Sequence, residues 1–259
     1  MSLLYLYGFV PSDASLPERG LLGVGDAPVE LVRLDGFAAA VGRPDPAVYG
    51  AEPLESRTGD MAWMAEQGLR HEQVVAWFVD HAAIVPSRLL TLFSSEAALA
   101  DAAGEGTRIR QDLERFSAAR EWDLKVSYDP ARLEGKLGEV SDEIARLDEE
   151  IADAGPGKRF LLEKKRKDVA KTEGRAIARQ KAAELLDTLR ADAEDSVVLP
   201  AASESAPVVL NAALLVPTGS EAAVRERAAE ARERLEPVGI VVAFTGPWAP
   251  YRFAGGPDA

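Results

Sequence analysis

The two histidines are the first residues to test for chemistry, because imidazole serves both as a metal ligand and as a general base. His71 and His81 fall in a segment, 60–81, whose apolar spacing predicts a helix. Ten residues along a helix separate them by about 15 Å, too far to share one metal ion. His71-Glu72 begins a zinc-protease pattern, but residue 75 is Val rather than His. The chain also lacks cysteine, so we expect no metal site.

Phosphate-binding and nucleophile motifs are also incomplete. Gly157-Lys158 ends like a P-loop, but residue 152 is Ala where the loop needs its first Gly. Gly23-Val24-Gly25 is a fragment of a dinucleotide motif with no helix predicted after it. No GxSxG elbow occurs. We therefore expect neither a cofactor nor catalysis. The abundant carboxylates are expected to solvate helix faces, although their number alone leaves an acid–base pair open.

Charge restricts the classes of partner. The chain has 43 acidic and 30 basic residues and a net charge of -13, which disfavours general nucleic-acid binding and docking on an anionic membrane. One basic run, Lys164-Lys165-Arg166-Lys167, departs from this balance. Neutralisation by a neighbouring acidic helix is the favoured interpretation, and partner binding by Lys164, Lys165 and Arg166 is the alternative.

An aromatic tail closes the chain. Residues 246–253 read Gly-Pro-Trp-Ala-Pro-Tyr-Arg-Phe, and the two prolines favour an extended path. Such a segment either packs on its own domain, which we favour, or presents aromatic side chains to a partner. Trp248, Tyr251 and Arg252 are the candidate partner-binding residues of this segment.

The composition also predicts where the protein is found. The first residues lack the basic region and cleavage site of a signal peptide, and no apolar run is long enough to cross a membrane. The absence of cysteine agrees with a reducing compartment. We therefore expect a cytoplasmic protein.

The elements that must position these residues divide near residue 120. In the first part, strands are predicted at 3–10, 29–34, 37–41 and 84–93, helices at 60–81 and 95–119, and a proline-containing loop at 42–59. Asp35-Gly36 is a tight-turn signal between two strands, and Gly104 and Gly106 are positioned to break the last helix. This order predicts an N-terminal α+β domain, 1–120, of degenerate ferredoxin-like type.

A helical hairpin at 130–193 is the clearest periodic feature of the second part. Apolar residues recur at a 4-3-4-3-4 spacing typical of a coiled-coil seam: Leu133, Leu137, Val140, Ile144, Leu147 and Ile151. Residues 154–157, Ala-Gly-Pro-Gly, must break the helix. A second helix is predicted from 158 to 193, with Leu162, Val169, Ala176 and Ala183 facing the first. We expect an antiparallel coiled coil.

The remaining elements complete a domain around this hairpin. Strands are predicted at 121–128, 197–199, 207–216 and 239–245, and a helix at 220–235. The resulting βαββαβ order predicts a C-terminal ferredoxin-like domain, 121–259, that contains the hairpin at 130–193 and the tail at 246–253. The fold class is therefore α+β with two domains. The fold does not assign a function.

Several short blocks together resemble the GvpL/GvpF family of gas vesicle proteins. The tail at 246–253 resembles the family's C-terminal signature, and further blocks follow the family's order at 5–10, 71–72, 121–126 and 155–161. One block departs from the family pattern: Pro86-Ser87-Arg88 is followed by Leu89-Leu90 where the family usually has Phe-Gly.

The resemblance implies a two-domain α+β protein that takes part in gas vesicle formation. It implies contact with the small hydrophobic shell protein GvpA and with other accessory proteins, as a minor vesicle component or as an assembly factor. From the acidic net charge we expect neither nucleic acid nor a lipid membrane as a partner. Two other functions stay open: a small-molecule-binding or catalytic α+β module, and a scaffold that acts only through its coiled coil.

Overall fold

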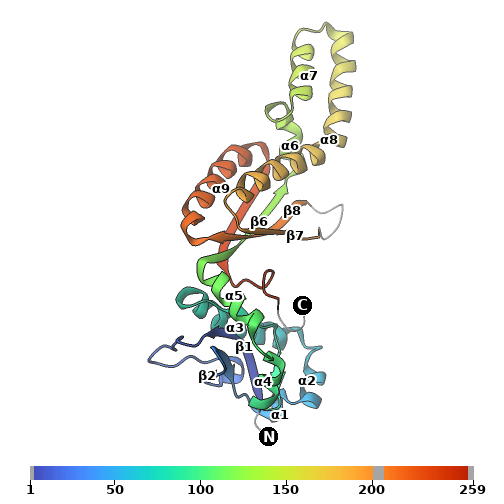
Figure 1. The fold of residues 1–259 in the computed structure, drawn as a ribbon. Coiled ribbons are helices and arrows are strands. Elements are labelled where there is room, and N and C mark those ends of the chain that lie inside the picture. The colour runs from blue at the N-terminus through green and yellow to red at the C-terminus, as the bar shows by residue number, and fades with distance from the viewer. Residues whose placement is uncertain (1–2, 201–206, 256–259) are drawn as a thin grey trace. The chain divides into compact units, whose positions relative to one another are not determined.

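A computed structural model describes residues 3–200 and 207–255, and the chain divides into two compact units. Unit 1 comprises residues 1–120 and 247–259, and unit 2 comprises residues 121–246. Each unit combines a β-sheet with helices (Figure 1), so the chain has the mixed α+β architecture expected from its sequence. We expected the tail to belong to the C-terminal domain. It groups instead with unit 1, because it bonds to helices of that unit.

The sheet of unit 1 has the strand order β2-β3-β1-β4, and β5 also pairs with β1. Its strands are β1 (Leu4–Pro11), β2 (Val29–Arg33), β3 (Phe37–Gly42), β4 (Val85–Pro86) and β5 (Leu92–Phe93). The recorded pairs are antiparallel. Gly36, with φ of 81°, forms the tight turn that the sequence predicted between β2 and β3.

Helices cover both faces of this sheet. They are α1 (Pro46–Tyr49), α2 (Ala51–Arg57), α3 (Met61–His81), α4 (Glu96–Ala103) and α5 (Thr107–Ala118). Tyr5 and Tyr7 of β1 share a core with α3, whereas Leu6 and Phe9 line one cavity together with Ile109 of α5. A register irregularity between Leu6 and Gly8 shifts the alternation of side chains along β1, so Phe9 lies on the face of Leu6 rather than on that of Tyr5 and Tyr7.

Two predictions for unit 1 are wrong in detail. The segment 42–59, expected to be a loop, contains α1 and α2, because Asp45 caps α1 and Pro46 occupies its first turn. The single strand expected at 84–93 is two short strands separated by a loop at 87–91. Within this loop Leu90 has a φ of 64°, which is incompatible with a continuous strand.

The sheet of unit 2 has the order β7-β8-β6-β9. Its strands are β6 (Ala119–Tyr128), β7 (Asp195–Val198), β8 (Val208–Pro217) and β9 (Ile240–Trp248), and the first residues of β6 and the last of β9 belong to unit 1. Helix α9 (Glu221–Leu235) shares the core of this unit with the sheet. Leu124, Leu214 and Val224 are completely buried there.

The helical segment differs from the predicted hairpin. It consists of α6 (Pro130–Lys136), a 3-10 turn η2 (Leu137–Glu139), α7 (Asp142–Ala152) and α8 (Pro156–Arg190). The predicted seam residues are buried or half-buried, but they do not lie on one continuous helix. Gly135 and Gly138 weaken the helix at the break, and the Ser141 hydroxyl accepts a hydrogen bond from the Ile144 N–H to start α7.

Helix α8 changes its partner along its length. Its first half packs beside α7, and its second half packs on the sheet of unit 2 (Figure 1). The predicted inward residues Ala176 and Ala183 are exposed, whereas Ile177, Ala178 and Ala182 are buried. The heptad register therefore fails beyond the end of α7, because a short helix cannot set the register of a longer one.

Candidate functional site

His71 lies at the centre of a buried hydrogen-bond network in unit 1. Helix α3 carries His71, whose side chain is 1% exposed. Its Nδ1 lies 2.9 Å from the Tyr5 hydroxyl of β1, and its Nε2 lies 3.0 Å from the Tyr251 hydroxyl of the tail. The Tyr251 hydroxyl donates to Glu72 Oε1 at 2.8 Å, and the Leu90 N–H donates to the Tyr5 hydroxyl at 3.0 Å. One imidazole thus connects β1, the 87–91 loop and the tail.

The proton positions in this network follow from donor capacity. Tyr251 gives its one proton to Glu72, so its oxygen accepts from His71 Nε2. Neutral imidazole carries one proton, so Nδ1 accepts from Tyr5. The Tyr5 oxygen in turn accepts from Leu90. We assign the Nε2-protonated tautomer to His71 on this basis.

Burial keeps the network uncharged at His71 and Tyr5. It lowers the pKa of His71 from 6.5 to about 4, because the imidazolium would lose its hydration. It also raises the pKa of Tyr5 above its ordinary value and that of Tyr7 to about 12. Both nitrogens of His71 are engaged in hydrogen bonds. The arrangement therefore suits holding segments together rather than transferring protons.

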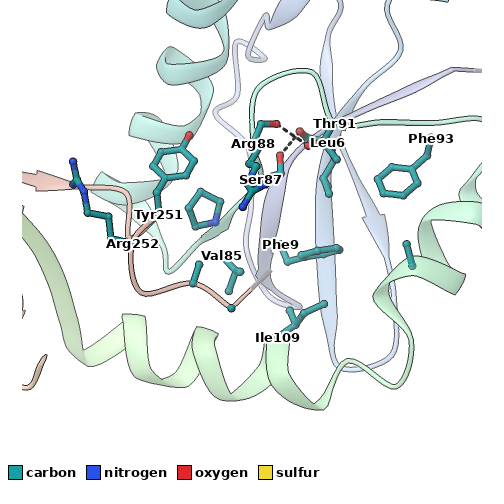
Figure 2. Close-up of a pocket in the computed structure, with 14 residues that line it drawn as sticks. Leu6, Phe9, Val85, Ser87, Arg88, Thr91, Phe93, Ile109, Tyr251 and Arg252 are labelled. Carbon is teal, nitrogen blue, oxygen red and sulfur yellow. Dashed lines mark hydrogen bonds between the residues drawn. The ribbon is translucent and has the colours of Figure 1, made fainter. Parts of the chain in front are cut away.

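A cavity of about 490 Å³ lies beside this network (Figure 2). The 87–91 loop contributes Ser87, Arg88 and Thr91 to its wall, and the tail contributes Tyr251 and Arg252. The rest of the wall is largely apolar, with residues Leu6, Phe9, Val85, Pro86, Phe93, Ala102, Ile109, Ala254 and Gly255. The network therefore joins two segments that line the same cavity.

The structure brings two of the predicted partner-binding residues of the tail to this cavity. Tyr251 and Arg252 line it, and Phe253, the last residue of the tail, is buried. Trp248 is 51% exposed and lines a separate hollow of unit 1 with His81 and Pro250. The tail thus docks within the chain, as favoured from the sequence, but on unit 1 rather than on the C-terminal domain to which we assigned it, and it keeps one aromatic side chain accessible.

The predicted basic site lies on α8 in unit 2. The Arg166 guanidinium forms two hydrogen bonds with the Asp148 carboxylate of α7, through Nε to Oδ1 and, at 3.1 Å, through Nη2 to Oδ2. Lys164 and Lys165 are exposed. Neutralisation by the acidic helix therefore holds for Arg166, whereas the structure records no ion pair to α7 for the two lysines in the described ranges.

Metal-binding groups do not converge in the part of the chain that the structure describes. No cluster of three or more His, Asp or Glu side chains suitable for a metal ion occurs within residues 3–200 and 207–255. His81 is exposed and stacks on Trp77, with ring centroids 4.3 Å apart. His71 is occupied by two tyrosines.

Sequence reasoning missed the roles of Tyr5 and Arg88. Tyr5 was assigned only to a strand, and Arg88 only to a block that departs from the family pattern. Alternation along β1 could have placed Tyr5 on the face of α3, but nothing local shows that a tail 180 residues from His71 in sequence bonds to the same imidazole.

The comparisons with known proteins identify the family. A family model described as gas vesicle synthesis protein GvpL/GvpF matches residues 3–255. The chain belongs to the GvpL/GvpF family. Members of this family are gas vesicle synthesis proteins and not a known class of enzymes, so the chain is a protein of gas vesicle formation.

Individual relatives agree with this membership. The chain is 29% identical to gas vesicle protein L of Streptomyces sp. (strain CB03234), across 98% of this chain and 93% of that protein. It is also 29% identical to gas vesicle protein L2 of Halobacterium salinarum, across 95% of this chain and 87% of that protein.

Solved structures of family members share the fold. The crystal structure of GvpF from Anabaena sp. PCC7120 matches with a TM-score of 0.66 and 18% identity, covering 98% of this chain and 96% of that one. GvpF from Microcystis aeruginosa matches with a TM-score of 0.68 and 16% identity, covering 98% of this chain and 99% of that one.

Among the described helices, none combines the length and apolar character needed to span a bilayer.

Proposed function

We propose that this member of the GvpL/GvpF family is a non-enzymatic accessory protein, located in the cytoplasm and on gas vesicles, that binds the shell protein GvpA and other gas vesicle proteins. The observation that carries the proposal is the family match across residues 3–255, nearly the whole chain. In this function the protein offers surfaces to other polypeptides, either as a minor vesicle component or as an assembly factor.

The start of α8 is the first proposed contact surface. Phe160 and Leu161 are 68% and 66% exposed, although most large apolar side chains of unit 2 are buried. Lys164 and Lys165 follow one helical turn later and are also exposed. An apolar pair beside two cations in a chain of net charge -13 favours a partner with apolar and acidic side chains. Arg166, bonded to Asp148, would position this surface rather than contact the partner.

Trp248 is the second proposed contact. Its indole is half-exposed, and aromatic side chains are frequent energetic centres of protein interfaces. Tyr251 and Arg252 would support it by holding the tail on unit 1, since the Tyr251 hydroxyl bonds to α3.

The finer fold assignment is part of the same proposal. We infer that each unit is a ferredoxin-like domain and that α7 and α8 form an antiparallel hairpin inserted in the second. The strand orders β2-β3-β1-β4 and β7-β8-β6-β9 support this, because both place the strands in the relative order 2-3-1-4.

Co-purification with GvpA tests the α8 surface. Phe160→Ser with Leu161→Ser is expected to weaken capture of GvpA at least tenfold, and Lys164→Glu with Lys165→Glu is expected to do the same. The matched control is Leu22→Ser with Val198→Ser, which replaces two other large apolar residues that are 54% and 51% exposed. Capture by the control should equal that by the wild-type chain.

Two results would contradict the proposal. Failure of the wild-type chain to capture GvpA or any accessory gas vesicle protein would remove the function, and equal capture by the α8 variants and the control would remove this surface. The alternative of a small-molecule-binding module is favoured by one observation, the cavity of unit 1.

A further inference from the structure

The charged residues that line the cavity of unit 1 differ in sign from the net charge of the chain. Two arginines, Arg88 and Arg252, line it, and no aspartate or glutamate is among its described lining residues. The whole chain, in contrast, carries 43 acidic and 30 basic residues. The charged residues of the lining itself are therefore cationic, which favours an anion inside the cavity.

The remaining wall favours an apolar body on that anion. Phe9, Phe93 and Ile109 line the cavity together with five other residues that present apolar side chains, and its volume of about 490 Å³ is within the range of small-ligand sites. We propose that this cavity binds an amphipathic carboxylate, with its apolar chain against β1 and α5 and its carboxylate toward Arg88. This binding is independent of the α8 surface, which lies in unit 2.

The loop that carries Arg88 is held in a costly conformation. Leu90 adopts a φ of 64°, a left-handed geometry that costs a residue with a side chain of order 1 kcal/mol or more. The Tyr5 hydroxyl compensates by accepting from the Leu90 N–H, and Thr91 Oγ1 donates to the Arg88 carbonyl at 2.7 Å. Such strain is typical of segments whose shape serves binding.

The same network also holds the part of the wall that the tail contributes. Tyr251 lines the cavity and bonds to His71, which bonds through its other nitrogen to Tyr5. The 87–91 loop and the tail are therefore fixed through one imidazole before any ligand arrives. A site that is organised in advance loses less entropy on binding.

Calorimetric titration of the full chain with decanoate, below its micelle concentration, tests the proposal. We expect saturable binding of one decanoate per chain, and at least tenfold weaker binding of decyltrimethylammonium, which has the same chain and the opposite charge. Hydrogen exchange should show protection by decanoate in residues 87–91 and 251–255.

Three variants locate the binding. Arg88→Glu should weaken decanoate binding at least tenfold, whereas Arg19→Glu, the same change at another exposed arginine of unit 1, should alter it less than twofold. Ala102→Phe should also weaken it at least tenfold by filling the cavity from an exposed position on α4, where it does not disturb the core. Absence of decanoate binding, equal binding of the cationic analogue, or unchanged affinity in both Arg88→Glu and Ala102→Phe would overturn the proposal. None of these results bears on GvpA capture.

Discussion

Tyr251→Phe isolates the bond between the tail and His71. The substitution keeps the ring and removes one hydroxyl, which accepts from His71 Nε2 at 3.0 Å and donates to Glu72 at 2.8 Å. Because His71 is 1% exposed, its Nε2 would lose the hydroxyl acceptor of Tyr251 where water cannot readily replace it, at a cost of about 1–3 kcal/mol. Glu72 is exposed, so water replaces its lost bond at little cost.

A loss of about 2 kcal/mol would open the tail roughly 30-fold more often. Hydrogen exchange can follow this opening at the tail amides, since Tyr251, Phe253 and Ala254 donate backbone hydrogen bonds within residues 249–254. We expect these amides to exchange about 30-fold faster in Tyr251→Phe, with the α3 amides unchanged.

A tyrosine of unit 2 provides the control for this experiment. Tyr128→Phe removes a tyrosine hydroxyl in unit 2 and should leave exchange in the tail unchanged. If the tail amides of Tyr251→Phe exchange within twofold of wild type, the reasoning is refuted. The packing of Ala249 and Phe253, which are 6% and 7% exposed, would then hold the tail alone.

Three further predictions concern stability. Burial lowers the pKa of His71 from 6.5 to about 4, so the free energy of unfolding of unit 1 should fall by up to about 3 kcal/mol as pH falls between these values. His71→Gln should remove this part of the pH dependence, measured by denaturant titration at each pH. The same pH dependence in both proteins would contradict the prediction. Gly106→Ala should destabilise unit 1 by about 1–3 kcal/mol, because Gly106 has a φ of 64° and an added Cβ would collide with Phe37 Cε1. An unchanged denaturation midpoint would argue against this strain. Ile144→Ala, at a completely buried site between α7 and α8, should lower the free energy of unfolding by about 2–5 kcal/mol in thermal or denaturant unfolding. Leu161→Ala, at a 66% exposed site, should lower it by less than about 0.5 kcal/mol. Equal losses would show that α7 does not pack as described.

The helical segment at 130–193 differs from what its apolar spacing predicts. The apolar spacing at 133–151 identified residues that are buried or half-buried, but it could not show that the helix breaks between Lys136 and Ser141. It also extended the heptad register of α8 to Ala176, although the partner of α8 changes from a helix to a sheet along its length. A periodic pattern reports that a face is buried, not what buries it.

The sequence by itself determined the α+β class, the position of most strands and long helices, and the family, because apolar period, turn residues and short blocks are local properties. The tertiary structure alone decided that the tail joins unit 1, that Arg88 and Arg252 line one cavity, and that Tyr5, Tyr251 and Leu90 are linked through His71. These contacts join residues as much as 180 positions apart. Their partners are selected by the packing of the whole unit, which no single window of sequence contains.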